Sequence, residues 1–152
     1  MKIGEALAEK KRLQSRLAKC YKLLESSFYY HEKPDFSYDK LRKEIDELLE
    51  KIKDFKLRII KTNLKLDVEV EGKTISLAEL IIEIGDTRSK ISTFEDLYKN
   101  RDDWYDMRDD NVIKKPQVEP EKIEDEIKQL SKRKTKLDSL LQHYNWTEEL
   151  IN

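Results

Sequence analysis

Apolar residues recur in steps of three and four along most of the chain, the repeat of helices that pack through one narrow apolar face. Four stretches carry it, which predicts four long helices. The positions are Ile3, Ala6, Leu13, Leu17, Cys20 and Leu24; Leu41, Ile45, Leu48, Ile52, Phe55 and Ile59; Leu77, Leu80, Ile84, Thr87, Ile91, Phe94 and Tyr98; and Ile123, Ile127, Leu130, Leu137, Leu141 and Tyr144.

Local signals place the helix boundaries. The first helix is expected from about Ile3 to Ser26, and the second begins near Ser37 or Asp39, both of which are suitable N-cap residues. Ser76 and Glu79 form a capping box, in which each side chain serves the backbone amide of the other, so the third helix begins there. Pro120 suits the first turn of the fourth helix.

The fourth helix is predicted to stop at Asn145, because Asn tolerates the left-handed backbone that ends helices. Trp146 would then fold back onto Leu141. In the third helix, Gly85 is a weak point and suggests close approach of a neighbouring helix.

Between the second and third helices the period changes. Apolar and charged residues alternate from Leu64 to Val70, and a turn at Glu71 and Gly72 leads to Ile75, which predicts a two-stranded hairpin. Val68 and Val70 would share one face and are candidates for contact with a partner, because an isolated hairpin is only marginally stable. The segment from Val112 to Val118 reads as extended and could add an edge strand.

These elements together predict a mainly all-α fold. Four long helices form an antiparallel coiled-coil-like bundle, with a small β-hairpin between helices two and three, in one helical domain over residues 1–152. Lys10 and Lys134 interrupt the apolar faces of the first and fourth helices, and the sequence leaves open whether they share a layer.

Two connections hold unusual residues. From Ser27 to Tyr38 the chain has five aromatic residues and His31, which either form a ligand platform or cap the end of the bundle. From Asn100 to Asn111 it is acidic and aromatic. Its interface candidates are Trp104, Tyr105 and Arg108, residue types enriched in binding hot spots, and its weak metal-ligand candidates are Asp102, Asp103, Asp106, Asp109 and Asp110.

Composition supports long helices with charged outer faces. The 31 basic and 32 acidic residues nearly cancel, and only three Gly and three Pro occur among the 152 residues. The basic runs at Lys10–Arg12 and Lys132–Lys134 have acidic residues one turn away, so we expect no nucleic-acid partner. Without a long apolar stretch or a signal sequence, we expect a cytoplasmic protein without a membrane partner.

Little in the sequence points to catalysis. Three isolated glycines make no phosphate-binding loop, and the two histidines have no clear acid or nucleophile beside them in sequence. Cys20 is the only cysteine and falls on an apolar face, which favours a small buried side chain over a reactive thiol. We therefore expect no catalytic residue and no cofactor, and the sequence favours a non-enzymatic protein over an enzyme.

Several segments spread along the chain form one recognisable pattern. They are Ile60–Asn63, Thr74–Glu79, Tyr105 and Arg108 before Ile113–Lys114, Leu137–Asp138, Leu141–Gln142 and Asn145–Leu150. Together they resemble a family of small bacterial proteins of unknown function that is often labelled septicolysin and has a member in the diphtheria bacterium. The resemblance covers nearly the whole chain and implies long antiparallel helices with a small β element, without established catalytic residues. The family label implies a pore-forming toxin, which the lack of a long apolar segment opposes.

The sequence favours a non-enzymatic, oligomeric coiled-coil scaffold or adaptor, since four narrow apolar faces and a hairpin call for more partner surface than one chain offers. The partner would be a second copy, an unknown protein, or both. The alternative is a small-molecule or divalent-cation-binding protein, possibly an enzyme, that uses the aromatic loop at 28–38 and the acidic segment at 102–110.

Overall fold

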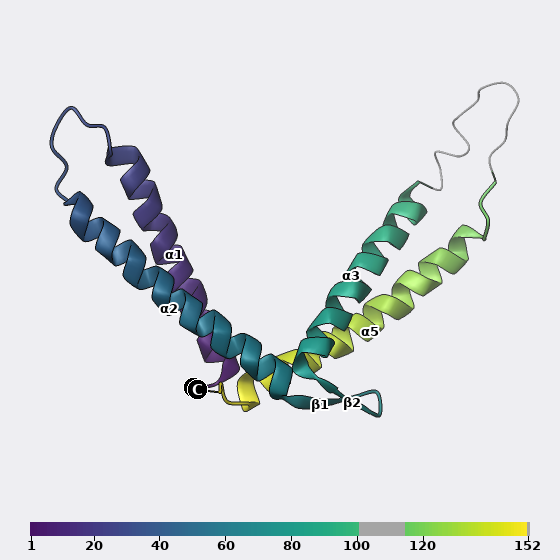
Figure 1. The fold of residues 1–152 in the computed structure, drawn as a ribbon. Coiled ribbons are helices and arrows are strands. Elements are labelled where there is room, and N and C mark those ends of the chain that lie inside the picture. Colours follow the sequence, from purple (N-terminus) through teal and green to yellow (C-terminus); the bar gives the residue numbers. More distant parts are fainter. Residues whose placement is uncertain (101–114, 152) are drawn as a thin grey trace, which may run out of the picture. The chain divides into compact units, whose positions relative to one another are not determined.

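Four helices and one hairpin make up the part of the chain that the structure, a computed structural model, describes: residues 1–100 and 115–151. The predicted fold class is confirmed, with the two-stranded hairpin between the second and third helices (Figure 1). The elements in chain order are α1 (Ile3–Ser27), α2 (Tyr38–Lys65), β1 (Asp67–Val70), β2 (Lys73–Ser76), α3 (Leu77–Lys99) and α5 (Pro120–Thr147).

The chain divides into two compact units. The first consists of Met1–Leu66 with Gln142–Asn152, and the second of Asp67–Leu141. Each unit contains a pair of helices, α1 with α2 and α3 with the larger part of α5. The assignment of residues 1–152 to one domain stays a prediction.

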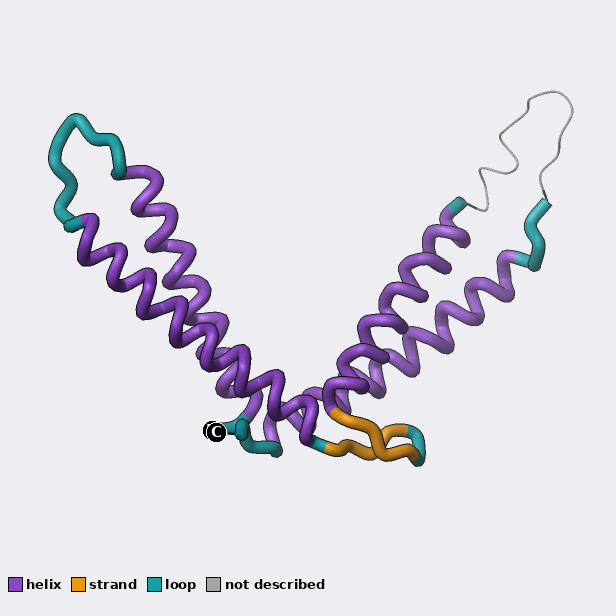
Figure 2. Tube along the Cα trace, in the orientation of Figure 1, coloured by secondary structure: helices purple, strands orange, loops and turns teal. Residues whose placement is uncertain are grey.

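In the first unit, α1 and α2 form an antiparallel helical hairpin (Figure 2). Their predicted apolar faces meet, because residues spaced three and four apart line one side of each helix. Leu17, Leu24, Phe36 and Phe55 pack around this core. Its buried members are Leu13, Cys20, Leu41, Ile45, Leu48 and Ile52.

The two ends of the chain pair with each other in the first unit. Lys2 and Glu149 form an antiparallel β-bridge, with hydrogen bonds from the Ile3 amide to the Glu148 carbonyl (3.1 Å) and from the Leu150 amide to the Met1 carbonyl (2.8 Å). Leu150 is buried in a second apolar cluster with Ala6 and Ile59. The last residues therefore complete the base of the helical hairpin.

This pairing corrects the predicted helix stop. Helix α5 continues through Asn145, which is buried and has no left-handed backbone, and ends at Thr147. Trp146 is 58% exposed, and its ring lies against Gly4 of α1, where an added Cβ would come within 2.9 Å of it. The helix ends where the chain begins its pairing with Lys2, a contact far away in sequence.

In the second unit, β1 and β2 pair in the register Asp67–Ser76 to Val70–Lys73. The turn residues Glu71 (φ 51°) and Gly72 (φ 80°) both have positive φ, as the favoured two-residue hairpin turns require. The sheet has these two strands only within the described chain, and residues 115–118 form no strand, so the suggested edge strand is absent there.

Helix α3 begins as predicted. The Ser76 hydroxyl accepts a hydrogen bond from the Glu79 amide (3.2 Å), and the Glu79 carboxylate accepts one from the Ser76 amide (2.7 Å). Gly85 is exposed and no neighbour lies within 4 Å of an added Cβ, so the suggested close approach of another helix at Gly85 is wrong. The buried side of α3 is formed by Leu77, Leu80, Ile84, Thr87 and Ile91.

Candidate functional site

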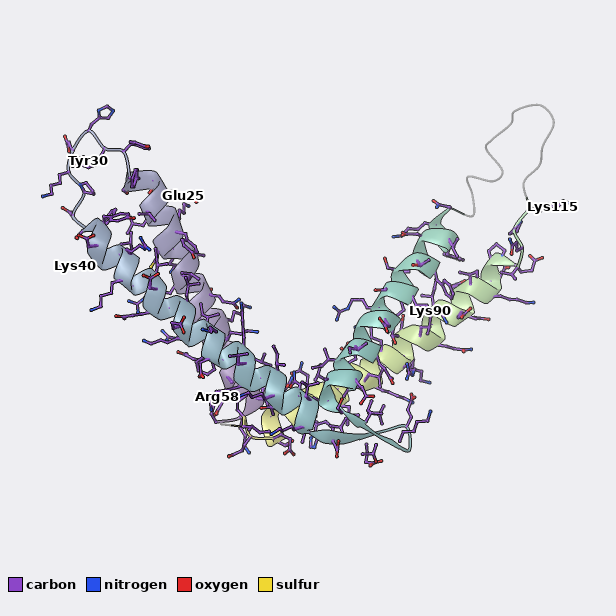
Figure 3. The ribbon with its side chains drawn as sticks, in the orientation of Figure 1. Glu25, Tyr30, Lys40, Arg58, Lys90 and Lys115 are labelled. Atoms are coloured by element: carbon purple, nitrogen blue, oxygen red, sulfur yellow. The ribbon has the colours of Figure 1, made fainter. Side chains whose placement is uncertain are left out.

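The loop between α1 and α2 gathers aromatic side chains at the surface. Helix α1 ends at Ser27 and α2 begins after Ser37, its N-cap residue. Pro34 lies midway and cannot take part in a helical hydrogen-bond ladder. Tyr30 lies in this loop (Figure 3). Both helices are anchored in the core below, so the loop is held at its two ends.

Most of the loop aromatics are exposed. Tyr29 is 89% exposed and Tyr30 59%, and Phe28 and Tyr38 are about half exposed. Only Phe36 packs against the core of the helical hairpin. The prediction that the aromatics fill the end of the bundle thus holds for Phe36, while the others face solvent. Large exposed aromatic clusters are typical of interaction sites.

The exposed rings are ordered by contacts with one another. Phe28 makes edge-to-face contacts with Tyr29 (centroids 5.0 Å apart) and Tyr38 (6.2 Å). A hydrogen bond with Tyr38 raises the pKa of the Arg42 guanidinium, which also lies 3.8 Å from Asp46. These contacts hold Tyr38 at the start of α2 as one wall of the loop.

A hollow of about 350 Å³ opens between the loop and the helix ends. This volume is within the range of small-molecule sites, and it also suits one large side chain of a protein partner. The single charged residue on its wall is Lys33. The lining residues are Leu24, Ser27, Phe28, Tyr30, Lys33, Pro34, Phe36, Ser37 and Tyr38.

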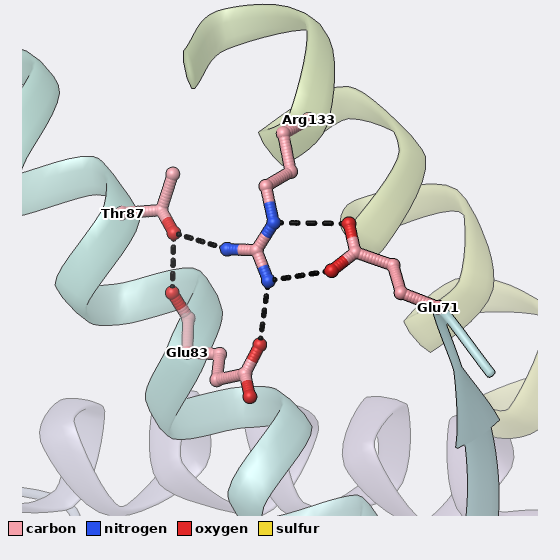
Figure 4. A network of polar contacts seen from close by, with 4 residues as sticks. All are labelled: Glu71, Glu83, Thr87 and Arg133. Carbon is pink, nitrogen blue, oxygen red and sulfur yellow. Dashed lines mark hydrogen bonds and ion pairs between the residues drawn. The ribbon is translucent and has the colours of Figure 1, made fainter. Parts of the chain in front are cut away.

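The second unit holds a polar network around Arg133 of α5 (Figure 4). Its guanidinium binds both carboxylate oxygens of Glu71 at 3.0 Å and one oxygen of Glu83 at 2.9 Å. It also lies 3.5 Å from the hydroxyl of Thr87, which donates to the Glu83 backbone carbonyl. One side chain thereby ties the hairpin turn, α3 and α5 together.

The network behaves as a structural tie. The hydrogen bond from Arg133 holds the pKa of the Glu71 carboxyl below its usual value, and the bonds to Glu71 raise the pKa of Arg133. A bidentate guanidinium–carboxylate pair fixes both position and angle. The four hydrogen bonds of this network use four of the five N–H groups of the Arg133 guanidinium.

Sequence reasoning missed this network. The sequence places Arg133 in the basic run Lys132–Lys134 and Glu71 in the hairpin turn. Their separation of 62 residues hides the pair. The one available signal was that Glu71 must accept a left-handed backbone, which is unfavourable for Glu and implies a compensating contact.

Some of the residues singled out from the sequence lie within the described part of the chain, and the others lie outside it. Val68 and Val70 are 1% and 5% exposed, covered by the chain itself, so a partner contact there stays a prediction. Lys134 pairs with Asp138 of its own helix at 2.6 Å. The remaining candidates lie outside the described residues: Trp104, Tyr105, Arg108, Asp102, Asp103, Asp106, Asp109 and Asp110.

The described residues also bear on a reactive thiol, a metal site and a membrane-spanning helix. The Cys20 thiol is buried, which raises its pKa, as expected for a packing residue. Over residues 1–100 and 115–151, no three His, Cys, Asp or Glu side chains are grouped to hold a metal ion. The same part of the chain has no helix with the length and apolar character needed to cross a membrane.

Comparison with known proteins gives a family. Residues 3–150 match DUF6847, a family of unknown function. The chain belongs to this family. A crystal structure of a functionally unknown conserved protein from Corynebacterium diphtheriae superposes with a TM-score of 0.87 over 99% of each chain, at 21% sequence identity. At 21% identity, this similarity shows that the two chains share a fold. No curated protein matches.

Proposed function

We propose that this DUF6847 protein is a non-enzymatic, oligomeric scaffold or adaptor that binds a protein partner through the aromatic loop at 28–38. The observation that carries the proposal is the exposure of four loop aromatics, Phe28, Tyr29, Tyr30 and Tyr38. Of these, Phe28, Tyr30 and Tyr38 line the hollow. Tyrosine contributes large contact area with few rotatable bonds, so it is enriched where proteins bind each other.

The helical hairpin suits this role. Long antiparallel helices with a continuous core hold a loop at a fixed distance from the rest of the unit, and the exposed Tyr29 and Tyr30 give it contact area. A partner would insert one apolar side chain into the hollow and place an acidic group near Lys33. Contact with a protein accounts for the exposed rings better than the pore formation implied by the septicolysin label.

The proposal includes the cytoplasm as the place of action and excludes nucleic acid as the partner. The single free thiol of Cys20 fits a reducing compartment. Basic and acidic residues are balanced in number, whereas nucleic-acid-binding proteins typically carry an unbalanced basic surface.

Site-specific photocrosslinking in producing cells tests the loop. A photoreactive residue at Tyr29 should give a discrete adduct with one protein, and the same residue at Lys19, an exposed position on α1, should not. The adduct should disappear when Tyr30→Ala and Phe28→Ala are added. Circular dichroism melting checks that these variants stay folded. Equal labelling from Tyr29 and Lys19 would contradict the proposal.

The hollow also favours a second candidate, the binding of a small molecule. Its volume of about 350 Å³ is large enough for a compact apolar ligand. A ligand bound there raises the melting temperature of the wild type and not of a Phe36→Ala, Tyr38→Ala variant. For the acidic segment at 102–110, Ca²⁺ or Mn²⁺ in excess should raise the melting temperature if it binds a cation.

A further inference from the structure

Helix α2 exposes a second apolar face beside its buried one. Leu49, Leu57, Ile60 and Leu64 are between 41% and 63% exposed. At about 100° per residue these four side chains fall within about 80° around the helix. None of the four belongs to the buried core that α2 forms with α1. We call these four residues the α2 stripe.

Charged residues follow one edge of the α2 stripe in a fixed order. Glu50 and Asp54 lie toward its beginning, and Lys61 and Lys65 toward its end. All four are exposed. Among the described residues, the acidic pair has intrahelical partners, Lys53 at 3.3 Å from Glu50 and Arg58 at 3.6 Å from Asp54. Within the described chain, the two lysines make no ion pair.

This order has a two-fold pattern. Reversing the helix about the point between Leu57 and Arg58 exchanges Glu50 with Lys65 and Asp54 with Lys61. The four residues of the α2 stripe are centred on the same point. In an antiparallel pair of identical helices related by a two-fold axis, each edge meets the same edge of the other copy in reverse. Acidic residues of one copy then face lysines of the other.

We propose that two copies of this chain pair through the α2 stripe in an antiparallel arrangement, with the two-fold axis near Leu57. The proposal deepens the oligomeric part of the proposed function by naming the partner and the surface. Lys53 falls within the stripe, and its alkyl stem can cover apolar neighbours while its ammonium stays with Glu50 at the edge.

The size of the contact sets its strength. From Leu49 to Leu64 the helix spans about 24 Å, at about 1.5 Å per residue. One helix face of this length gives an interface at the small end of the range for specific complexes. We therefore expect a dimer that dissociates on dilution in the micromolar range rather than a permanent one.

Two charge-reversed variants test the pairing. In one, Glu50→Lys and Asp54→Lys make the edge of the α2 stripe entirely basic, and in the other, Lys61→Glu and Lys65→Glu make it entirely acidic. Each variant alone should be monomeric by light scattering, because like charges then face each other. Mixed in equal amounts, they should form a heterodimer of twice the chain mass.

A control separates specific pairing from general attraction. Lys40→Glu with Lys43→Glu changes the net charge as much as the acidic variant, at exposed positions of α2 before the stripe. This control should dimerise like the wild type and should not pair preferentially with the basic variant. Far-ultraviolet circular dichroism of every variant shows that the helices are intact.

The outcomes distinguish the inference from the proposed function. A wild-type dimer whose charge-reversed variants also dimerise, or fail to pair when mixed, would overturn the α2 stripe while leaving the oligomer in place. A wild type that stays monomeric at millimolar concentration would overturn both the stripe and the oligomer. Neither result would bear on partner binding through the aromatic loop, which the photocrosslinking experiment tests separately.

Discussion

Gly4 and Trp146 offer a direct test of how the chain ends are held together. Gly4 is buried in the first turn of α1, and the Trp146 ring covers it. A Cβ added at Gly4 would meet three ring atoms at 2.9 to 3.0 Å, which is too close for a van der Waals contact. Gly4→Ala therefore sets two effects against each other.

The relative sizes of the helix-propensity gain and the overpacking cost decide whether Gly4→Ala stabilises or destabilises the protein. Alanine is better than glycine inside a helix by about 0.5–1 kcal/mol. Overpacking of a fitted contact costs about 1–3 kcal/mol. The difference of these two ranges means that in the wild type we expect Gly4→Ala to destabilise the protein by about 0–2.5 kcal/mol. When Trp146 is replaced by Ala, only the helix-propensity gain remains, so Gly4→Ala should stabilise the protein.

Trp146→Ala is the second substitution of a double-mutant cycle with Gly4→Ala. Full removal of a buried tryptophan costs about 3–5 kcal/mol. Because the ring is 58% exposed, roughly two-fifths of that cost is expected, or about 1–2 kcal/mol. The exposure thus reduces the effect expected of a fully buried ring.

Urea unfolding followed by far-ultraviolet circular dichroism measures all four proteins of the cycle. The two changes should couple by about 1–3 kcal/mol, and Gly4→Ala should change sign between the two backgrounds. If Gly4→Ala stabilises the wild type and the Trp146→Ala variant equally, the ring does not rest on Gly4 and the account of the chain ends is refuted.

Three further predictions concern single interactions. Ser76→Ala removes the cap of α3 and should lower the unfolding free energy by about 1 kcal/mol, measured by urea titration. Arg133 lowers the pKa of Glu71, so the stability difference between the wild type and Glu71→Gln should be full above about pH 4.5 and shrink as pH falls through the lowered folded pKa; a difference independent of pH would contradict the pair. The Cys20 thiol should react with a thiol reagent far more slowly in the folded protein than in urea, and equal rates would contradict its burial.

Local chemistry in the sequence predicted most of the fold. The capping box at Ser76 and Glu79 is complete within four residues, and the hairpin turn at Glu71 and Gly72 within two. The apolar repeat of α1 and α2 is likewise local and identifies the faces that meet. Each of these signals needs only neighbouring residues, so it can be read without the structure.

Contacts between distant residues could not be predicted in the same way. Asn145 looked like a helix stop because the local rule favours Asn there, yet pairing of Lys2 with Glu149 lets α5 continue. The partnership of Arg133 with Glu71 is hidden for the same reason. Tertiary pairing decided the outcome in both cases. At Asn145 it acted against a local preference, and at Glu71 the positive φ was the one local signal.

The candidate site was predictable from the sequence only in part. Sequence composition identified the aromatic loop and left open whether its rings fill the bundle end or face a ligand. The structure divides them: Phe36 packs on the core, and Tyr29 and Tyr30 are exposed. That division depends on where α1 ends and on the direction of each ring, which composition does not contain. The α2 stripe could not be predicted in the same way, because the apolar pattern alone does not show that Leu49, Leu57, Ile60 and Leu64 are exposed.

The central claim, an oligomeric scaffold, is tested most directly by the solution mass of the wild type. Light scattering on a sizing column, over a roughly hundredfold range of loading concentration, reports the self-association equilibrium. The account predicts a mass that rises with concentration from the 18.2 kDa of one chain toward twice that value. A mass that stays at one chain over the whole range would contradict it.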